Sequence, residues 1–446
     1  MRSNKSDSGA GSYAQDPGST AQLAEAIRHG KLTAVELVQR YLDRIAVVDP
    51  HVQCWRQVDA ARALADAQLR DDEVKAGRIR GALHGIPVAI KDIIDVEGVQ
   101  TLANCRARRD IAPATGDAEI VLALRNAGAI IIGKVHTTEF AFFDPSPARN
   151  PHNLGHTPGG SSSGSAVAVA SGTAPLAIGT QTVASVNRPA AYCGIAAFKP
   201  STRSMSTFGI TPLGPSYDTP GFYGWRVDDA VYAYEAVAPS FARNWRQASG
   251  DAPIRIVLPV DPHTSDAISC MKDAQRRTAD ALTNAGHAVV EKPSPISFEA
   301  LFKMQRSTTL YEAGRALKSL LDHPKGQVGE KLTAAIVEGL AMPMSRYLDE
   351  RAAIDDMRRE FFTTFADVDV FLWPAAPDTA PKGLEWTGDP KYIAPWTALG
   401  GPIVSLPAGK AVNGLPVGCL LAGHPGADRQ MTVWARRLAA AAERHD

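Results

Sequence analysis

The chain has 446 residues and a formal net charge of zero, because 47 Lys and Arg residues balance 47 Asp and Glu residues. This balance argues against a surface for nucleic acid or anionic membranes, and no run reaches the roughly 18 apolar residues of a membrane helix, so we expect a small-molecule partner. The five Cys residues show no metal-ligand spacing, and their odd number argues against a disulfide framework, which favours a reducing, cytoplasmic location.

The first part of the chain is predicted to alternate helix and strand. Residues 1–19 have no apolar core and are predicted to be a disordered tail rather than a signal peptide. In chain order, the next predicted elements are helices over 20–29, 33–47 and 59–75, a strand over 87–96, a helix over 117–127, a strand over 129–133 and an ordered loop over 137–153. The order strand, helix, strand favours an α/β sheet that contains parallel strands.

The second part continues this alternation around a longer helical region. The predicted elements are a strand over 192–198, a loop over 201–224, a helix over 227–238, a candidate boundary at 243–251, a strand over 254–258, a helix over 265–285, helices through most of 298–366, strands over 368–372, 403–406 and 417–421, and a helix over 427–443.

Two pairs of residues deserve a test as metal ligands. Asp92 and Asp95 stand close together, and His152 and His156 are four residues apart. Neither pair has a third ligand at a useful spacing, so we predict no metal site and expect the two carboxylates to cap backbone or surface groups.

The most informative stretch spans residues 159–190, GGSSSGSAVAVASGTAPLAIGTQTVASVNRPA. Small apolar residues without a charge predict that it is buried, and a Gly/Ser linker would not continue into AVAVASG and PLAIG. Buried hydroxyl groups need partners, because an unpaired one costs about 1–3 kcal/mol. The sequence therefore predicts a buried network of serines, which suggests nucleophilic chemistry.

Lys91 interrupts the apolar run of HGIPVAIKDIIDV. Burial disfavours the ammonium form and lowers the pKa of a lysine, so a buried Lys91 would be able to take a proton from serine. The run alone leaves a second interpretation open, a lysine at a strand end that extends to water.

These residues carry a family resemblance. HGIPVAIKD, TPGGSSSGSA, GTQTVASVNRPAAYCG and FKPS resemble motifs of the amidase signature family, with further likeness in GKVHTTEFAFFDPSPARNPHNL and PIVSLPAG, from about residue 20 to about residue 440. The resemblance implies an α/β fold with one large mixed β-sheet between helical layers. It also implies a single domain over 20–446, with a variable helical region at about 296–366 that shapes the substrate pocket.

The resemblance assigns roles within a Ser, cis-Ser, Lys triad. It implies that Lys91 is the catalytic lysine, Ser161 the cis-serine and Ser185 the nucleophile. A proton would pass from Ser185 through Ser161 to neutral Lys91, and water would later hydrolyse the acyl-enzyme. The N–H groups of Thr182, Val183, Ala184 and Ser185 would form the oxyanion hole, with Ser162 in support. The resemblance implies neither a metal nor an organic cofactor.

Four positions depart from the family pattern. Val183 and Ala184 stand where the family usually has two glycines, and a β-branched valine cannot reach a positive φ cheaply. Gln181 and Asn187 replace a common Asp and a common Arg, so a hydrogen-bonded amide pair is expected to keep the shape of the loop, with Arg188 as a compensating charge.

Aromatic residues suggest the nature of the pocket. Phe142 and Phe143 are predicted either to line it or to pack in the core. A C-terminal loop is predicted to hold four further rings, Trp373, Trp386, Tyr392 and Trp396. As pocket residues, Trp373, Tyr392 and Trp396 would suit an aryl or long apolar substrate.

Three functions remain open. The first is hydrolysis of a carboxamide or carbamate, as in the aryl-amidase and urethanase-like branch, by a monomer or a homodimer. The second is an amidotransferase subunit that passes ammonia to a partner, which itself binds the nucleic acid. The third is an impaired or binding-only protein, suggested by Val183 and Ala184.

Overall fold

One mixed β-sheet runs through the molecule. The structure is a computed structural model that describes residues 12–238 and 252–443. Within these residues the sheet has eleven strands in the order β1-β3-β2-β4-β6-β5-β10-β11-β9-β7-β8. The strands are β1 (Trp55–Val58), β2 (Pro87–Lys91), β3 (Ile130–Val135), β4 (Leu176–Gln181), β5 (Ala196–Lys199), β6 (Thr219–Gly224), β7 (Arg255–Val260), β8 (Ala288–Pro293), β9 (Val370–Pro374), β10 (Ile403–Lys410) and β11 (Pro416–Ala422).

Parallel pairs lie in two parts of this sheet. β2 pairs in parallel with β3 and β4, and β7 pairs in parallel with β8 and β9, whereas the remaining neighbours are antiparallel. Every residue of β2 and β4 is buried, as expected for central strands covered on both faces. The predicted α/β fold with a large mixed sheet is confirmed.

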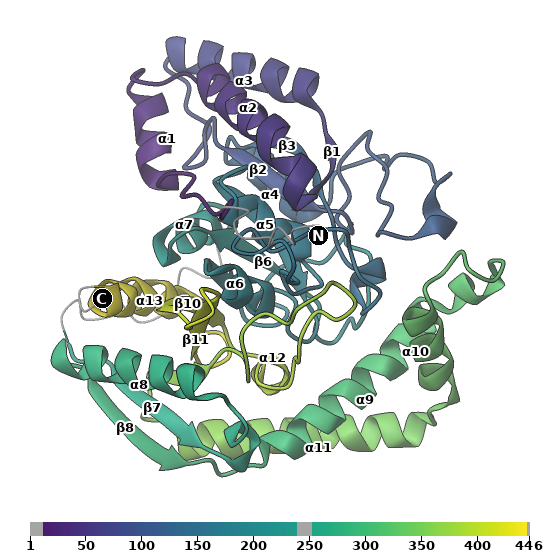
Figure 1. Ribbon diagram of the computed structural model, residues 1–446, viewed down its shortest axis with the longest axis vertical. Coiled ribbons are helices and arrows are strands. Elements are labelled where there is room, and N and C mark those ends of the chain that lie inside the picture. Colours follow the sequence, from purple (N-terminus) through teal and green to yellow (C-terminus); the bar gives the residue numbers. More distant parts are fainter. Residues whose placement is uncertain (1–11, 239–251, 444–446) are drawn as a thin grey trace, which may run out of the picture.

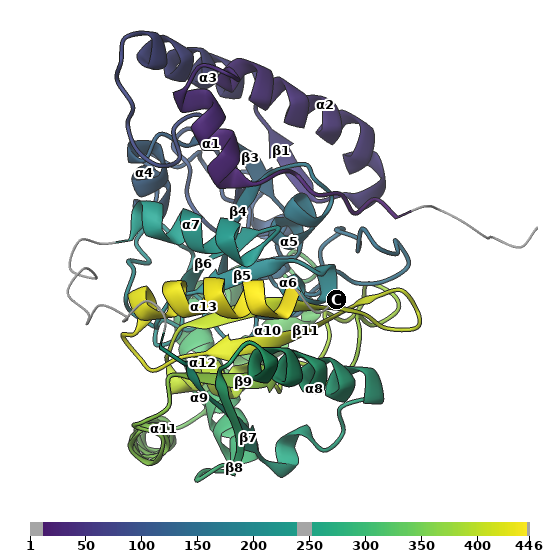
Figure 2. The ribbon, with the colours of Figure 1, turned by 90° about the vertical axis from the view of Figure 1, so that its left-hand side faces the viewer.

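Helices cover the sheet and both ends of the molecule. They are α1 (Thr20–Arg28), α2 (Ala34–Val52), α3 (Ala60–Lys75), α4 (Glu119–Asn126), α5 (Ser163–Ala170), α6 (Asn187–Cys193), α7 (Val227–Val237), α8 (Ser269–Asn284), α9 (Phe298–Ala316), α10 (Glu330–Ala341), α11 (Met344–Thr364), α12 (Ala394–Leu399) and α13 (Asp428–Glu443). Helices α1 to α3 lie together at one end, and α9 and α11 lie at the other (Figure 1). Helices α7, α13 and α8 follow one another across the strands (Figure 2).

Helix α5 packs unusually close to the end of β3. A Cβ atom on Gly164 would lie 2.5 Å from the main-chain nitrogen of His136 and 2.7 Å from the carbonyl oxygen of Cys54. Only glycine fits such a contact, and the other members of this helix are also small. The small residues between 159 and 190 therefore let a helix and a strand approach each other at the centre of the fold.

Several predicted boundaries were wrong. Residues 192 and 193 end α6, and the strand predicted over 192–198 begins only at Ala196. The predicted loop over 201–224 contains β6. Its Gly and Pro residues are unusual in a strand, which is why the sequence indicated a loop, and pairing with β4 and β5 stabilises the strand. The candidate boundary at 243–251 lies outside the described residues.

Residues 12–19 of the predicted tail contact the rest of the protein. The main-chain N–H of Tyr13 donates to Pro151, and that of Gln15 donates to Ala170. Residues 12–19 therefore pack on the body of the protein, which corrects the prediction, while residues 1–11 lie outside the described part. No helix in the described part combines the length and apolar character needed to cross a membrane. A cytoplasmic location stays a prediction.

Candidate active site

The side chain of Lys91 lies at the end of β2 in the interior of the protein. Its Nζ atom donates to Ser161 Oγ and to Thr180 Oγ1, each at 2.8 Å. The residue is fully buried, and burial holds the pKa of Lys91 well below its ordinary value, against a smaller opposing effect of the Asp218 carboxylate. The alternative of a lysine that extends to water is therefore wrong.

The carboxylate of Asp92, which follows Lys91 in the sequence, forms ion pairs with residues other than Lys91. Asp92 forms ion pairs with Lys134, at 3.1 Å, and with Arg56, at 3.0 Å. The side chains of Asp92 and Lys134 are almost completely buried, whereas that of Arg56 is slightly more exposed. Asp92 thus belongs to a buried charge cluster, which corrects its predicted role as a backbone or surface cap. Lys91 forms no ion pair among the described residues.

The serines expected at the site lie on two adjoining loops. The peptide bond between Gly160 and Ser161 is cis, and both Ser161 and Ser185 are buried, with 2% and 7% of their surface exposed. The carbonyl oxygen of Ser185 accepts hydrogen bonds from the N–H of Ser162, at 3.4 Å, and from the hydroxyl of Tyr223, at 3.0 Å. The bond from Ser162 joins the loop of Ser185 to the loop of Ser161, and the bond from Tyr223 ties it to β6.

The other hydroxyl groups of the segment are largely paired with the backbone. Ser162 Oγ donates to the carbonyl oxygen of Thr180 and accepts from its N–H. Ser165 donates to the carbonyl oxygen of Ile178 at 3.1 Å. The predicted buried hydroxyl network is present, and it fastens α5 to β4.

The loop of residues 182–185 has main-chain donors without internal acceptors. None of its four N–H groups donates to an acceptor among the described residues. Neither Val183 nor Ala184 is among the described non-glycine residues with positive φ. These two residues therefore stand at the positions of the family's glycines without entering the left-handed region, so their backbone carries no strain of that kind.

Gln181 holds this loop through three hydrogen bonds. Its Oε1 atom accepts from the N–H groups of Val186, at 2.8 Å, and Asn187, at 3.0 Å, and its Nε2 atom donates to Thr397 Oγ1 at 2.9 Å. The Asn187 side chain instead donates to Ser405 Oγ at 3.0 Å. The two amide side chains do not pair with each other as expected, because each finds a partner on another element.

Arg188 is buried beside the same loop. Its guanidinium donates to the carbonyl oxygens of Gly160, at 2.8 Å, and Gly388, at 2.6 Å, and to Thr387 Oγ1 at 3.0 Å. Burial lowers the pKa of Arg188 to about 10. It contacts neither Gln181 nor Asn187 by a hydrogen bond, so it supports the loop of Ser161 rather than compensating at those positions.

Sequence reasoning missed three residues that support the loop. Asp218 accepts from the hydroxyl of Thr182 and from the N–H groups of Leu213 and Gly214, while its own burial raises the pKa of the carboxyl group. Tyr223 and Thr180 complete the set. Asp218 immediately precedes β6, and Tyr223 lies within that strand, which was predicted as loop, so nothing local marked them.

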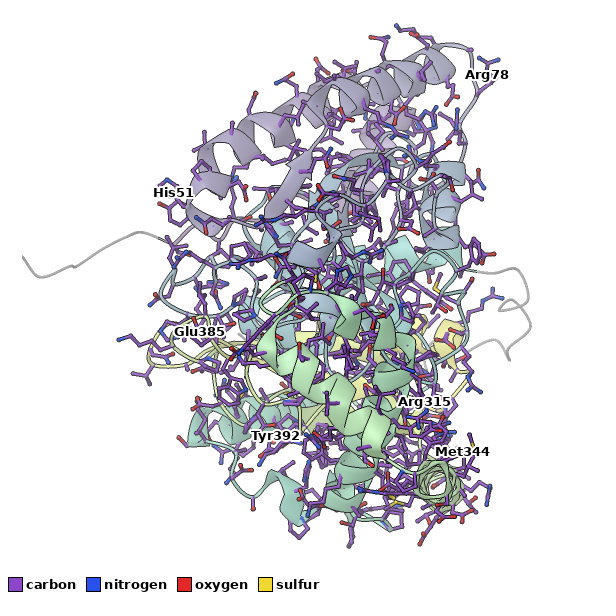
Figure 3. The ribbon with its side chains drawn as sticks, turned by 90° about the vertical axis from the view of Figure 1, so that its right-hand side faces the viewer. His51, Arg78, Arg315, Met344, Glu385 and Tyr392 are labelled. Carbon is purple, nitrogen blue, oxygen red and sulfur yellow. The ribbon has the colours of Figure 1, made fainter. Side chains whose placement is uncertain are left out.

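A cavity of about 520 Å³ adjoins the loop of residues 182–185 at Val183. Its wall is mostly apolar and includes Phe142, Phe143, Val183, Phe302, Leu310 and Trp386. Helices α9 and α10 supply most of one side. These helices face the viewer in Figure 3, where Glu385 and Tyr392 mark the segment beside them.

Only some of the aromatic residues predicted to line the pocket border the cavity. Phe142 and Phe143 line it, whereas Trp373, Tyr392 and Trp396 have at most 1% of their surface exposed and do not line it. Trp373 instead stacks on Phe298, and Trp396 packs edge-on against Phe298. The three predicted pocket residues on β9, α12 and the segment before it are therefore core residues, and Trp386 takes the place expected of them.

Comparisons with known proteins decide the family. A family model described as amidase matches residues 36–432. The chain belongs to the amidase family. This amidase is 32% identical to a glutamyl-tRNA(Gln) amidotransferase subunit from Salinispora arenicola, over 95% of this chain and 96% of the relative. The resemblance to the amidase signature family is thus confirmed.

Two solved structures place the amidase among enzymes of similar fold. The native peptide amidase from Stenotrophomonas maltophilia superimposes with a TM-score of 0.80 at 27% identity, covering 95% of this chain and 97% of the other. A chain solved in work on a vestigial protein complex and the origins of an s-triazine catabolic enzyme gives 0.86 at 26% identity, with coverages of 96% and 98%. Family and neighbours together identify this amidase as an amide C–N hydrolase.

Proposed function

We propose that the chain hydrolyses the C–N acyl bond of a small carboxamide or carbamate with an apolar or aryl substituent, through an acyl-enzyme on Ser185. The hydrogen bond between Lys91 and Ser161 carries this proposal. A buried lysine without an ion pair is neutral more readily than an exposed one, and a neutral amine accepts a proton. The loop with Ser185 is tied directly to the loop with Ser161.

The proposed reaction moves one proton in each direction. As Ser185 Oγ bonds to the substrate carbonyl carbon, its proton passes to Ser161 Oγ, and the proton of Ser161 passes to Lys91 Nζ. The C–N bond then breaks, and the relay returns the proton to the departing nitrogen. A water molecule attacks the acyl group by the same route, which releases the acid, or carbon dioxide and an alcohol from a carbamate.

The four N–H groups of Thr182 to Ser185 are the candidate oxyanion hole. They lack internal acceptors, so a developing negative oxygen would not have to displace an existing hydrogen bond. Such donors typically contribute about 2.7–4 kcal/mol each in the transition state. Gln181, Asp218 and Tyr223 hold the surrounding backbone in place.

The cavity supports the choice of substrate class. Aromatic rings from three segments, at Phe142, Phe302 and Trp386, face a space that suits one aryl group or a short apolar chain. Charged side chains at its wall are partly neutralised, as Arg306 pairs with Glu338 at 3.1 Å. A neutral ligand therefore suits the cavity better than a charged one.

The test is hydrolysis of a panel of p-nitroanilides and aryl carbamates. We expect Ser185→Ala to lower kcat/KM at least about 10³-fold, because the nucleophile is lost. Ser165→Ala, at a buried serine of α5, is the matched control and keeps most of the activity. A serine-directed fluorophosphonate should label Ser185. Turnover that survives Ser185→Ala would overturn the proposed mechanism.

A second candidate follows from the names of the relatives. The curated relative from Salinispora arenicola is a subunit of glutamyl-tRNA(Gln) amidotransferase, and its likeness spans nearly the whole chain. Under this alternative the chain releases ammonia from glutamine and passes it to a partner protein. Ammonia release from free glutamine that a partner stimulates, without hydrolysis of aryl amides, would favour it.

The third candidate, an impaired enzyme, rests on Val183 and Ala184. Their backbone conformation gives it no support, because neither has a positive φ. Val183 does line the cavity, so its side chain takes up space there. If only the Val183→Gly, Ala184→Gly double variant turned over the panel, the loop itself would be the cause.

A further inference from the structure

Gln305 of α9 combines complete burial with a position on the cavity wall. Its Nε2 atom donates to the carbonyl oxygen of Thr182 at 2.9 Å and to Thr309 Oγ1 at 3.2 Å. This fixes the orientation of the amide, because the reversed amide would place Oε1 against the Thr182 carbonyl, an acceptor against an acceptor. The oxygen of Gln305 is therefore identified by its surroundings.

That oxygen has no hydrogen-bond donor among the described residues. Buried side-chain acceptors nearly always have a partner, and an unmet one is costly. The wall around Gln305 is largely apolar, and its neighbour Thr309 already accepts from Nε2. Gln305 lines the cavity, so an occupant of the cavity is the candidate for the missing donor.

The position of Gln305 ties this acceptor to the reacting bond. Its carboxamide contacts Thr182, the first residue of the proposed oxyanion loop, and the cavity that it lines also touches Val183. A donor that reaches Gln305 while the substrate carbonyl lies at this loop must be close to that carbonyl. The N–H group of the scissile amide or carbamate, one bond from the carbonyl carbon, is the nearest candidate.

We infer that Gln305 is a specificity-determining residue that accepts a hydrogen bond from the N–H group of the scissile bond. The preferred substrates are then primary or secondary amides and N–H carbamates, and tertiary amides are rejected. A tertiary nitrogen leaves the buried oxygen unpaired and places an alkyl group against it, so discrimination comes from both effects. This inference rests on the proposed function, since it places the reacting carbonyl at the loop of Ser185.

The test compares two substrates that differ only at the scissile nitrogen. Phenylacetic acid p-nitroanilide and its N-methyl analogue are assayed with the wild type, Gln305→Leu and Gln305→Glu. The measured quantity is the ratio of kcat/KM for the N–H compound to that for the N-methyl compound. Because each ratio is taken within one protein, the intrinsic reactivities of the two compounds cancel between variants.

We expect Gln305→Leu to lower this ratio at least about tenfold, because the acceptor is gone. Gln305→Glu should keep the ratio within about twofold, because a buried, protonated carboxyl group donates to the Thr182 carbonyl and retains an acceptor oxygen at that place. Gln275→Leu is the matched control, since Gln275 also donates to a main-chain carbonyl, that of Leu372, but does not line the cavity. Gln305→Met, unbranched and without an oxygen, is the second variant if the leucine variant does not fold.

The outcomes separate this inference from the proposed function. A ratio that stays constant in both Gln305→Leu and Gln305→Met, while turnover still depends on Ser185, overturns the inference alone and shows that solvent satisfies the oxygen. An equal fall in both substrates, with the ratio unchanged, assigns Gln305 only to the support of Thr182. Turnover that does not depend on Ser185 overturns the proposed function instead.

Discussion

The guanidinium of Arg188 donates a hydrogen bond of 2.8 Å to the carbonyl oxygen of Gly160, the residue directly before Ser161. The same side chain donates to Gly388 and Thr387, on the segment that leads to α12. Its planar fork thus fastens the loop of Ser161 to a distant part of the chain through uncharged acceptors.

We expect Arg188→Lys to lower kcat/KM about 10–100-fold and to reduce the free energy of unfolding by about 2 kcal/mol, because a single ammonium cannot reach all three acceptors. Enzyme kinetics and urea denaturation measure the two effects. Arg358→Lys is the control, since Arg358 donates to the carbonyl oxygen of Ala398 and to Asp355 but not to the loop of Ser161. If both variants lost activity equally, Arg188 would have no special role in placing Ser161.

Gln181→Ala should reduce activity and stability together. The change leaves the N–H groups of Val186 and Asn187 without their acceptor inside the protein, at an expected cost of about 2–3 kcal/mol in the free energy of unfolding. Thr397→Val, which removes only the partner of the Gln181 Nε2 atom and the donor to Val183, should have a smaller effect. An unchanged melting temperature and an unchanged rate in Gln181→Ala would rule out this role.

The pH dependence of kcat/KM should reflect Lys91. Burial lowers the pKa of its ammonium group, so the neutral, proton-accepting form is already present at a pH where an exposed lysine is charged. We therefore expect kcat/KM to rise with pH through this lowered pKa and to level off above it. Lys91→Met should lower the rate at least about 10³-fold at every pH, without recovery at high pH.

The same shift affects stability with a definite sign. Between the lowered pKa of Lys91 in the folded state and its ordinary pKa in the unfolded state, the unfolded chain binds more protons, so the free energy of unfolding rises with pH. Urea denaturation across this range should show a smaller rise in Lys91→Met than in the wild type. Equal slopes in the two proteins would show that Lys91 is not the group responsible.

Val183→Gly should broaden substrate choice, whereas Ala184→Gly should not. The Val183 side chain lines the cavity, and the Ala184 side chain is completely buried elsewhere. Removing the isopropyl group should raise kcat/KM for the bulkier acyl groups relative to acetyl by about tenfold, measured on a series of p-nitroanilides. The same change of profile in Ala184→Gly would indicate an effect of backbone flexibility rather than of side-chain volume.

The sequence named the candidate catalytic groups through the motifs that resemble the amidase signature family. The residue pattern itself predicted a buried network of serines between residues 159 and 190 and left two interpretations of Lys91 open, and the family motifs singled out Lys91, Ser161 and Ser185. In the fold Lys91 is hydrogen-bonded to Ser161, and the N–H group of Ser162 donates to the carbonyl oxygen of Ser185. Motifs of this kind can be recognised in a sequence because they depend on residue type and on neighbours in the chain.

The surroundings of these groups were decided by tertiary structure. Trp373 and Trp396 are as aromatic as Trp386, yet they fill the core beside Phe298, while Trp386 borders the cavity. Gln305 meets Thr182, 123 residues earlier, only because α9 packs against the loop that follows β4. Composition and periodicity predict that a helix forms and which residues it buries. Where the side chains of a helix meet a loop from another part of the chain depends on how the elements pack. That packing determined which residues line the cavity and left the side-chain oxygen of Gln305 without a partner in the described part of the protein.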